Sequence, residues 1–427
     1  MKIGTDIAEI SRFEKLTAKD IPQKIFSDDE AAYILSKKNT AQTAAGIFAA
    51  KEAFVKAVGT GISDFPLNEI TVVHTPSGAP EIRLLNNAGK IFKRYFSGRI
   101  ELSISHDGNY AVATVCIETD KYFEYYKNAV SVYESCPEDS ITPKLVHPNL
   151  PERSRDIHKG SCGRLYVSAG SKGLTGAAVM SCTSALRCGA GLITLGCCES
   201  LNSIFEVALC EVMTKPLPDV NGILSASCAP IIAQEAQNAD VCLIGPGIGR
   251  DSAIRKITAK VFENENICAV ADADALYAAS KDIEILKNHK AELILTPHIG
   301  EFSALSKIPA DEILADTKAV SVEFAKEYNV TLVLKSHRTV VASPDGRCLV
   351  NITGNPGMAT GGSGDVLAGA IASFAAQGMK PFDAAYTGVY IHSLAADMAA
   401  AEKGEYSLTP GDIIDYLPYA IKFSTGR

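Results

Sequence analysis

Hydrophobic positions divide the chain into two stretches with different periodicities. In the first, residues 41–58 are rich in alanine and carry Ile47, Phe54, Val55 and Val58 at helical spacing, and Gly59 follows as a stop signal. Strands are predicted at 2–10, 69–73, 81–85, 100–105 and 110–117, the last two as a hairpin with His106 at its bend. One strong helix among paired strands indicates a small α+β domain.

From Arg164 onward, short apolar runs alternate with helical segments. Strands are predicted at 165–169, 192–195, 241–244, 268–271, 293–295 and 331–334, and a helix at 177–188. Unbroken apolar runs of this length are typical of parallel strands that are buried on both faces. We therefore predict an α/β domain with a mostly parallel sheet covered by helices on both faces, in a chain that is α/β overall.

Length and composition place the boundary and narrow the class of protein. A chain of 427 residues exceeds what one core usually supports. Residues 121–150 are aromatic and charged, then punctuated by prolines, so we expect domains at 1–120 and 151–427 with a linker at 121–150 that carries a docking helix or strand. A net charge of -8 argues against nucleic acid, and no apolar run is long enough for a membrane span. Scattered cysteines are expected to be buried thiols, and the protein to be cytoplasmic.

Residues 354–365 are the strongest candidate for an anion site. Five glycines among these twelve residues lead into an apolar helix, where backbone N–H groups and the helix N-terminus favour a phosphate. Asp365 is suited to take a proton from a hydroxyl that attacks phosphorus. The plainer alternative is a helix cap, with Asp365 bonded to backbone amides.

Polar loops follow five predicted strands of the second stretch. They are Gly170–Gly176, Gly245–Gly249, Asp272 with Asp274, Thr296–Glu301 and Lys335–Thr339. None of them is a P-loop or a Gly-x-Gly-x-x-Gly fingerprint. Because the carboxyl ends of parallel strands meet at one edge of a sheet, we expect these loops to form one cleft with residues 361–365.

The first 120 residues resemble holo-[acyl-carrier-protein] synthase. The matching motifs are Gly4-Thr5-Asp6-Ile7, the run from Phe48 to Ala57, Gly78-Ala79-Pro80 and the run from Ser103 to Asp107. The resemblance implies Mg²⁺-dependent transfer of 4'-phosphopantetheine from coenzyme A to apo acyl carrier protein by a homo-oligomer. It makes Asp6 and Glu52 metal ligands, and Lys56 and His106 catalytic residues. Taken alone, Glu52 and Lys56 would form a solvated i,i+4 salt bridge.

Residues 150 to 420 resemble ADP-dependent NAD(P)H-hydrate dehydratase, a metabolite-repair enzyme with a ribokinase-like fold. The matching motifs are His158-Lys159-Gly160, Gly163, Gly176-Ala177-Ala178, Gly245–Gly249, Asp272–Leu276, Thr296–Glu301 and Asn355–Asp365. The resemblance implies that ADP or ATP phosphorylates the hydroxyl of hydrated NADH or NADPH, and that phosphate then leaves. It makes Asp365 the general base and a contact of the hydrate. The hydrate pocket would be lined by Ala177, Gly247, Gly249 and His298, and the nucleotide would contact Lys335, Ser336, His337, Arg338, Thr339, Gly361, Gly362, Ser363 and Gly364.

The leading interpretation is a bifunctional enzyme. Two residues depart from the family patterns, and two alternative functions stay open. Ile47 stands where the synthase family usually has arginine, and Ser336 where the dehydratase family tends to have glycine. The second domain could instead be a vitamin-precursor kinase, although such kinases do not share the lead-in from Asn355 to Thr360. The first could be a non-catalytic module that docks a carrier protein.

Overall fold

The chain forms two compact units, Met1–Glu134 and Ser135–Thr425, each with its own hydrophobic core. The computed structural model describes residues 1–16, 21–59, 66–86, 88–89, 92, 99–118 and 136–425. Of the expected linker, residues 121–135 lie outside the described residues. The later part belongs to the second unit, where Ser140 bridges to Val350 and helix α5 (Pro143–Val146) contacts helix α16 (Pro381–Lys403).

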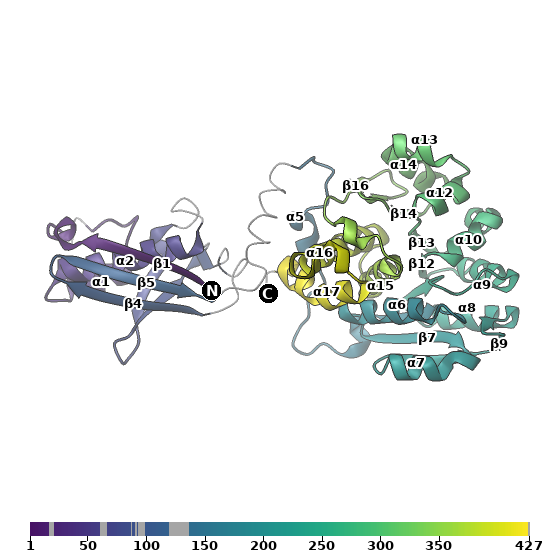
Figure 1. Cartoon of the computed structure of the whole chain (residues 1–427), viewed down its shortest axis with the longest axis horizontal. Coiled ribbons are helices and arrows are strands. Elements are labelled where there is room, and N and C mark those ends of the chain that lie inside the picture. Colours follow the sequence, from purple (N-terminus) through teal and green to yellow (C-terminus); the bar gives the residue numbers. More distant parts are fainter. Residues whose placement is uncertain are drawn as a thin grey trace. The chain divides into compact units, whose positions relative to one another are not determined.

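An antiparallel sheet and one long helix build the first unit (Figure 1). The strands β1 (Lys2–Glu9), β5 (Tyr110–Ile117) and β4 (Ile100–Asp107) pair in the order β1-β5-β4. Helix α2 (Thr40–Val58) packs on β1 and β5. This contact is close, because a Cβ on Gly4 would collide with the carbonyl oxygen of Ala53. The strands β2 (Ile70–His74) and β3 (Pro80–Leu84) form a separate hairpin, and helix α1 (Asp28–Leu35) begins with a capping box at Ser27.

The predicted helix and strands of this unit are confirmed, with one correction at the β4–β5 hairpin. His106 pairs with Ala111 and Asp107 with Tyr110, so both residues extend β4 and do not form the bend. The turn is made by Gly108 and Asn109 alone, and Gly108 has a φ of 53°. A two-residue hairpin turn requires positive φ, which glycine adopts without strain, so the ladder continues to its edge.

A buried lysine anchors α2. The Lys51 side chain is fully buried, and its Nζ donates to Glu30 Oε2 at 2.6 Å, to the Ile25 carbonyl at 2.6 Å and to the Leu67 carbonyl at 2.9 Å. Burial lowers the pKa of Lys51, while the charge of Glu30 opposes this shift. With three acceptors, the ammonium is satisfied inside the core and fixes the helix that carries Glu52 and Lys56.

Among the described residues, the second unit contains one sheet of nine strands and two short strands, β9 (Asp219–Val220) and β10 (Ile223–Leu224). The strand order is β16-β15-β14-β13-β12-β11-β6-β7-β8. The bounds are β6 (Arg164–Ser168), β7 (Leu192–Cys198), β8 (Met213–Leu217), β11 (Val241–Ile244), β12 (Cys268–Ala271), β13 (Glu292–Leu295), β14 (Thr331–Leu334), β15 (Val340–Ala342) and β16 (Cys348–Val350).

Neighbouring strands from β8 to β14 are parallel, whereas β15 and β16 join antiparallel. The mostly parallel sheet is thus confirmed. The pattern missed the strands β8, β15 and β16, because β8 contains Pro216 and the other two have only three residues each.

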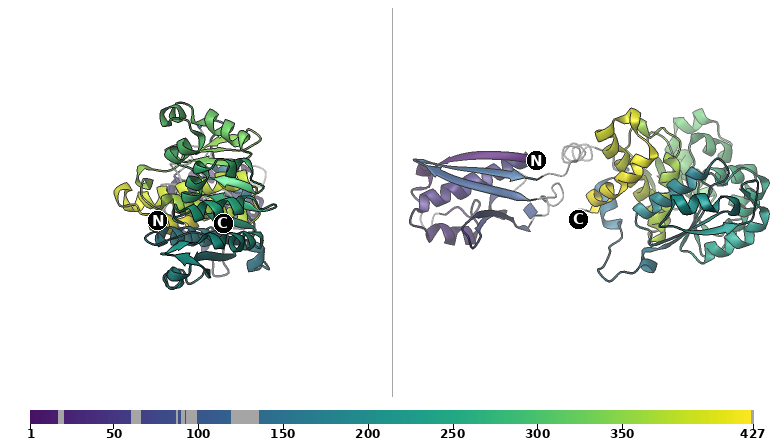
Figure 2. Two further views of the ribbon diagram at one scale, coloured as in Figure 1. Left: turned by 90° about the vertical axis from the view of Figure 1, so that its right-hand side faces the viewer. Right: turned by 60° about the horizontal axis from the view of Figure 1, so that its bottom comes forward.

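Helices cover both faces of this sheet (Figure 1, Figure 2). One face carries α6 (Thr175–Arg187), α15 (Ser363–Ala376) and α16, with α17 (Pro410–Thr425) packed on α16. The other carries α8 (Ala229–Gln237), α9 (Ser252–Phe262), α10 (Asp274–Lys281), α12 (Ile299–Ser306) and α14 (Thr317–Glu327). Shorter helices are α7 (Asn202–Ala208), α11 (Glu284–Lys287) and α13 (Ala310–Ala315).

The start of α15 is fixed by its contact with α6. A Cβ on Gly369 would collide with the Ser181 carbonyl oxygen, so the two helices touch through their backbones. The hydroxyls of Ser181 and Ser184 donate to the carbonyls of Asp365 at 3.2 Å and Val366 at 2.6 Å. These bonds hold the first turn of α15 in place.

The strand order reverses at β6, which has β7 on one side and β11 on the other. A crevice opens at such a switch point, outside the carboxyl ends of the strands. Here the Gly170 N–H donates to the Pro246 carbonyl at 2.9 Å and joins the loops that follow β6 and β11.

Seven cysteines are buried, namely Cys162, Cys182, Cys188, Cys197, Cys198, Cys228 and Cys242. Within the described part of the chain, no helix is both long and apolar enough to cross a membrane.

Candidate functional site

The glycine-rich segment forms the N-terminus of α15. Gly362 is the N-cap with a φ of 103°, and a Cβ there would lie 2.6 Å from the Met180 side chain. Space beside Gly361 is open, since no atom lies within 4 Å of a Cβ placed on it. The positive φ and the close approach explain glycine at position 362, and the helix start leaves backbone donors for an anion.

A carboxylate on α16 holds the lead-in to this segment. Asp397 accepts from the Gly354 N–H and from Asn355 Nδ2, both at 2.8 Å. Asn355 Oδ1 in turn accepts from the Gly357 N–H at 3.0 Å. Sequence reasoning did not single out Asp397, because it lies inside a long helix 42 residues after Asn355 and belongs to no motif.

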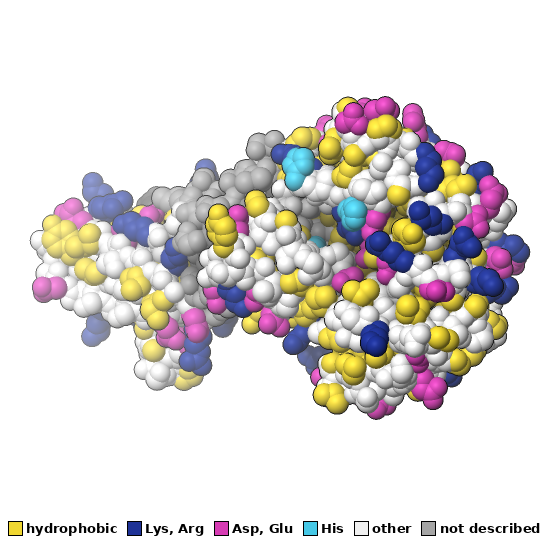
Figure 3. All heavy atoms as spheres, turned by 45° about the vertical axis from the view of Figure 1, so that its right-hand side comes forward, with side chains coloured by type: hydrophobic (Ala, Val, Ile, Leu, Met, Phe, Trp, Pro, Cys, Tyr) yellow, Lys and Arg dark blue, Asp and Glu magenta, His cyan; other side chains and the backbone are white. Residues whose placement is uncertain are grey.

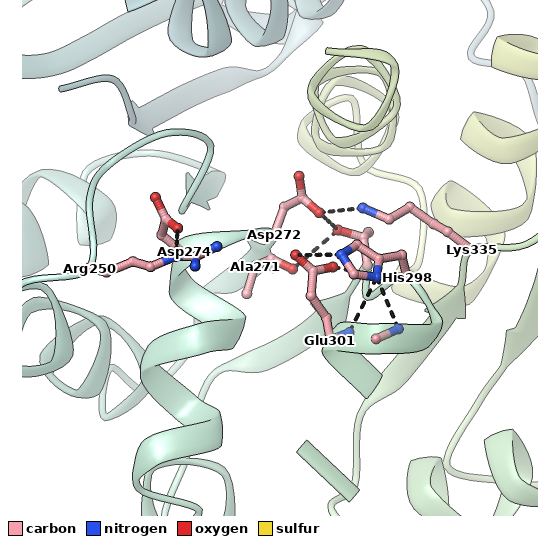
Figure 4. Close-up of polar contacts among 9 residues, drawn as sticks. Arg250, Ala271, Asp272, Asp274, His298, Glu301 and Lys335 are labelled. Carbon is pink, nitrogen blue, oxygen red and sulfur yellow. Dashed lines mark hydrogen bonds and ion pairs between the residues drawn. The ribbon is translucent and has the colours of Figure 1, made fainter. Parts of the chain in front are cut away.

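Lys335 reaches from the sheet to α15. It follows β14, and its Nζ donates to Asp272 Oδ1 at 2.8 Å (Figure 4). The Thr296 hydroxyl donates to the same oxygen at 2.7 Å. Lys335 Nζ also lies 3.2 Å from where a Cβ on Gly364 would be. The cation therefore stands at the helix N-terminus, where the resemblance places the nucleotide.

Asp365 is half-buried in the first turn of α15. Burial raises its pKa to about 7, the negative charge of Asp272 adds to the shift, and Lys335 opposes it. The N-cap of α15 is Gly362 and carries no side-chain capping bond, so the helix-cap alternative is disfavoured. A carboxyl group with a pKa near neutrality is suited to act as a general base.

The loop Gly245–Gly249 lies at the switch point. Gly245, Gly247 and Gly249 have φ values of 121°, 57° and 102°. A Cβ on Gly245 would collide with the Asp272 carbonyl oxygen, and one on Gly247 would lie 2.9 Å from Ala177 Cβ. The structure therefore brings Ala177 and Gly247 together.

Asp274 ties this loop to α10. Its Oδ2 accepts from the Gly249 N–H at 2.9 Å, and its Oδ1 accepts from Arg250 Nε at 2.8 Å (Figure 4). The preceding residue, Ala273, has a φ of 47°, which costs free energy for a residue with a Cβ. Such strain at a strand end is typical of functional sites.

His298 caps α12. Its Nδ1 accepts from the Gly300 N–H at 3.0 Å and the Glu301 N–H at 3.3 Å, and Glu301 Oε2 accepts from the His298 N–H at 2.9 Å. Because Nδ1 is an acceptor, the neutral ring carries its hydrogen on Nε2. The side chain is 60% exposed, so it can contact a ligand. A parallel bridge pairs its backbone with Lys335.

Residues 335–339 connect β14 to β15. The Ser336 hydroxyl donates to the Arg338 carbonyl at 2.9 Å and accepts from the Arg338 N–H at 3.2 Å, and Thr339 Oγ1 donates to the Ser336 carbonyl at 3.2 Å. Serine in place of glycine thus closes the turn through its side chain. His337 and Arg338 are exposed. On the face shown in Figure 3, acidic, basic and histidine side chains surround a hollow of the second unit.

His392 is a buried residue that the sequence did not indicate. It lies on α16 with Nε2 3.4 Å from the Ser363 hydroxyl. Burial lowers its pKa to about 4, so the ring is neutral at physiological pH. It adds no charge beneath the glycine-rich loop.

In the first unit, Asp6 and Lys56 form an ion pair. Lys56 Nζ donates to Asp6 Oδ1 at 2.7 Å, so the expected pairing of Lys56 with Glu52 is wrong. The reason is tertiary, because β1 runs against α2 and brings Asp6 within reach. Burial raises the pKa of Glu52, and the negative charge of Asp6 raises it further. The two carboxylates therefore lie close enough to repel each other.

The two carboxylates, Asp6 and Glu52, fit a Mg²⁺ ion. Mg²⁺ commonly takes one or two carboxylates and completes its shell with phosphate oxygens and water. Among the described residues, no group of three or more His, Cys, Asp or Glu side chains is placed to hold a metal.

The other two noted positions of this unit lie on and beside α2. His106 lies over Gly46, with its Nε2 2.9 Å from where a Cβ on Gly46 would be, and Ile47 is buried in the core.

Together, the parallel sheet, the glycine-capped helix and its acid define the second unit as a ribokinase-like α/β domain. The chain belongs to the NAD(P)H-hydrate dehydratase family, whose model matches residues 165–419. Residues 2–115 match the model of the 4'-phosphopantetheinyl transferase superfamily.

Named relatives agree with this assignment. A bifunctional NAD(P)H-hydrate repair enzyme, Nnr, of Moorella thermoacetica is 40% identical over 66% of this chain and 53% of its own length. An ADP-dependent (S)-NAD(P)H-hydrate dehydratase of Listeria monocytogenes is 32% identical over 66% of this chain and 96% of its own length. The chain thus spans about half the length of the bifunctional relatives it matches.

Solved structures are similar to the second unit. An ADP/ATP-dependent NAD(P)H-hydrate dehydratase from Bacillus subtilis, co-crystallised with ATP and Mg²⁺, is 28% identical with a TM-score of 0.58, over 67% of this chain and 99% of that one. A ribokinase-like superfamily protein from Enterococcus faecalis is 29% identical with a TM-score of 0.58, over 67% and 96%.

Proposed function

We propose that the second unit repairs hydrated NADH and NADPH by nucleotide-dependent dehydration. The observation that carries the proposal is the half-buried Asp365, whose pKa is raised to about 7, at the glycine-capped N-terminus of α15. A general base beside an anion-binding helix end is what phosphorylation of a hydroxyl requires. The family match and the names of the relatives support the same reaction.

The reaction begins with phosphoryl transfer. Asp365 takes the proton of the substrate hydroxyl as its oxygen attacks the terminal phosphorus of ADP or ATP, and the bond to the leaving nucleotide breaks. The ring nitrogen then expels phosphate as the C–O bond breaks, and loss of a ring proton restores the dihydronicotinamide. Phosphate leaves far more readily than hydroxide, which is why a nucleotide is consumed.

Several groups would bind the reactants. Lys335 and the backbone from Gly361 to Gly364 stabilise the charge on the transferring group. The nucleotide lies along residues 335–339, and the hydrate contacts Ala177, Gly247, Gly249, His298 and Asp365.

We further propose that the first unit transfers 4'-phosphopantetheine from coenzyme A to a serine of apo acyl carrier protein, a reaction that serves fatty acid synthesis. Asp6 and Glu52 would hold Mg²⁺, which supplies positive charge to the pyrophosphate of coenzyme A. Lys56 offsets negative charge at that point, and His106 stands near the nucleotide end. The adjacent carboxylates and the superfamily match at residues 2–115 support this role. Such a bifunctional enzyme would act in the cytoplasm as a homo-oligomer.

The second-unit proposal is tested by supplying the purified full chain with hydrated NADH and ADP or ATP. Recovery of dihydronicotinamide absorbance is expected, and Asp365→Asn should abolish it while the protein stays folded. A vitamin-precursor kinase would leave the hydrate unchanged, and that result would overturn the proposal.

The first-unit proposal is tested by incubating the full chain with coenzyme A, Mg²⁺ and a cognate apo carrier protein. The carrier should gain the mass of phosphopantetheine. Absence of this gain, with the carrier still bound, would favour the docking-module alternative.

A further inference from the structure

We propose that Asp272 is a positioning residue of the second site, and that its bond to Lys335 keeps the lysine ammonium from neutralising Asp365. Asp272 would thus do two things at once. It places a cation where the transferring phosphoryl group lies, and it leaves the general base without a counterion. This inference rests on the proposed role of Asp365 as the base.

The carboxylate of Asp272 is held rigidly. Its residue is 1% exposed, and Oδ1 accepts from both Thr296 Oγ1 at 2.7 Å and Lys335 Nζ at 2.8 Å. The Asp272 N–H donates to the Ile244 carbonyl at 3.1 Å. Only glycine fits against its carbonyl oxygen at position 245. With its backbone and carboxylate both fixed, Asp272 cannot turn away from the lysine.

Lys335 is anchored at its root, and the carboxylates of Asp272, Glu301 and Asp365 all act on its charge, Asp272 most strongly. The Lys335 N–H donates to the Pro297 carbonyl at 2.8 Å, which fixes the backbone from which the side chain extends. The tip lies beside Gly364, next in sequence to Asp365. The hydrogen bond, however, goes to Asp272. Attraction between charges falls with distance, so Asp272, which contacts the ammonium, attracts it more strongly than Asp365 does.

The groups that face Asp365 from each surrounding element add up to a negative environment. Asp272 after β12, Asp274 on α10 and Glu301 on α12 all raise its pKa, and Lys335 after β14 opposes them. The charge of Asp274 is partly offset by Arg250, its partner at 2.8 Å. On the α16 side, His392 is buried and neutral beside Ser363. Lys335 is therefore the cation among these groups, and its bond to Asp272 limits how far it lowers the pKa of Asp365.

The decisive variant is Asp272→Asn. It keeps the shape of the side chain but removes the charge that holds Lys335, so the ammonium can turn to Asp365 and stabilise its anion. The acid limb of the pH dependence of kcat/KM should move down by on the order of one pH unit. The nucleotide KM should rise as well, because Lys335 leaves its position. An acid limb at the wild-type pH would overturn the proposal.

A second readout needs no activity. The pH dependence of unfolding free energy, compared with and without the added change Asp365→Asn, reports the titration of Asp365 by linkage. In the Asp272→Asn background this titration should lie at lower pH than in wild type. If the wild-type protein recovers no dihydronicotinamide from the hydrate, the proposed function is overturned. If the wild-type protein recovers it but Asp272→Asn leaves the titration of Asp365 at the wild-type pH, only the role of Asp272 is overturned.

Two more variants separate the lysine effect from the simple loss of a charge. Asp274→Asn removes a carboxylate that is bonded to Gly249 and Arg250, so it should move the titration of Asp365 less than Asp272→Asn does. Should Asp272→Asn fail to fold, Lys335→Met decides alone. A small upward shift in the titration of Asp365 supports the proposal. An upward shift on the order of one pH unit or more would mean that Lys335 already neutralises Asp365 and would overturn it.

Discussion

Asp397, in the middle of α16, accepts a hydrogen bond from Asn355 at the start of the glycine-rich loop, with 2.8 Å between Oδ1 and Nδ2. Its other oxygen accepts from the Gly354 N–H at the same distance. Through these two bonds a helix far along the chain holds the segment that leads into α15. The geometry of the candidate phosphate site thus depends on a residue outside it.

Replacing Asp397 with alanine should loosen the loop without touching the reacting groups. Hydrogen bonds to a charged group contribute about 1.5–3 kcal/mol each, so we expect a loss of roughly 2 kcal/mol or more in unfolding free energy. The nucleotide KM should rise more than kcat falls. Denaturant unfolding and steady-state kinetics measure both. Unchanged values would show that the loop holds its shape by itself.

The raised pKa of Asp365 makes the stability of the protein depend on pH. The folded group has a pKa of about 7, above its unfolded value of about 3.9, so the folded state binds the extra proton between these pH values. Its contribution to stability is fully present below about pH 4 and is lost as pH rises through 7. The loss is at most about 4 kcal/mol. Denaturant unfolding from pH 4 to 8 should show this decline, and Asp365→Asn should flatten it.

Gly245→Ala tests the close approach at the switch point, and Gly378→Ala is its matched control. Both glycines have positive φ, 121° and 93°, so each variant bears backbone strain of about 1–3 kcal/mol. Only at position 245 would the new Cβ collide with a backbone atom, the Asp272 carbonyl oxygen, whereas position 378 has open space.

Gly245→Ala should therefore lose hydrate recovery, because relief of the collision displaces Asp272 and with it Lys335. Gly378→Ala should keep this activity despite a similar strain. Equal losses in the two variants would contradict the importance of that contact.

Asp6→Asn should abolish the response of the first unit to Mg²⁺. It removes one of two adjacent carboxylates and frees Lys56, so the remaining Glu52 offers a single ligand. We expect phosphopantetheine transfer to fall by roughly 100-fold or more, since a catalytic metal contributes several kcal/mol. Mass spectrometry of the carrier across a Mg²⁺ series measures this. Hydrate recovery in the same preparation should be unchanged, which shows that the protein is intact.

Sequence reasoning predicted that loops of the second unit meet at one edge of the sheet, because one geometric rule is enough for it. Parallel strands end at a common edge, so the loops after five strands had to meet there, and the structure places Asp272, Thr296 and Lys335 in direct contact. The glycine pattern likewise marked where positive φ and close approach occur, at Gly245 and Gly362. Short strands such as β15 escaped prediction because three residues carry too little pattern.

By itself, then, the sequence determined the parallel sheet and the residue types at its edge, because periodicity and glycine placement are local properties of a chain. Only the tertiary structure decided which charges pair. Lys56 on α2 bonds Asp6 on β1, 50 residues away, and Lys335 bonds Asp272, 63 residues away. Such pairs follow from strand order and helix packing, and so does the burial that raises the pKa of Asp365.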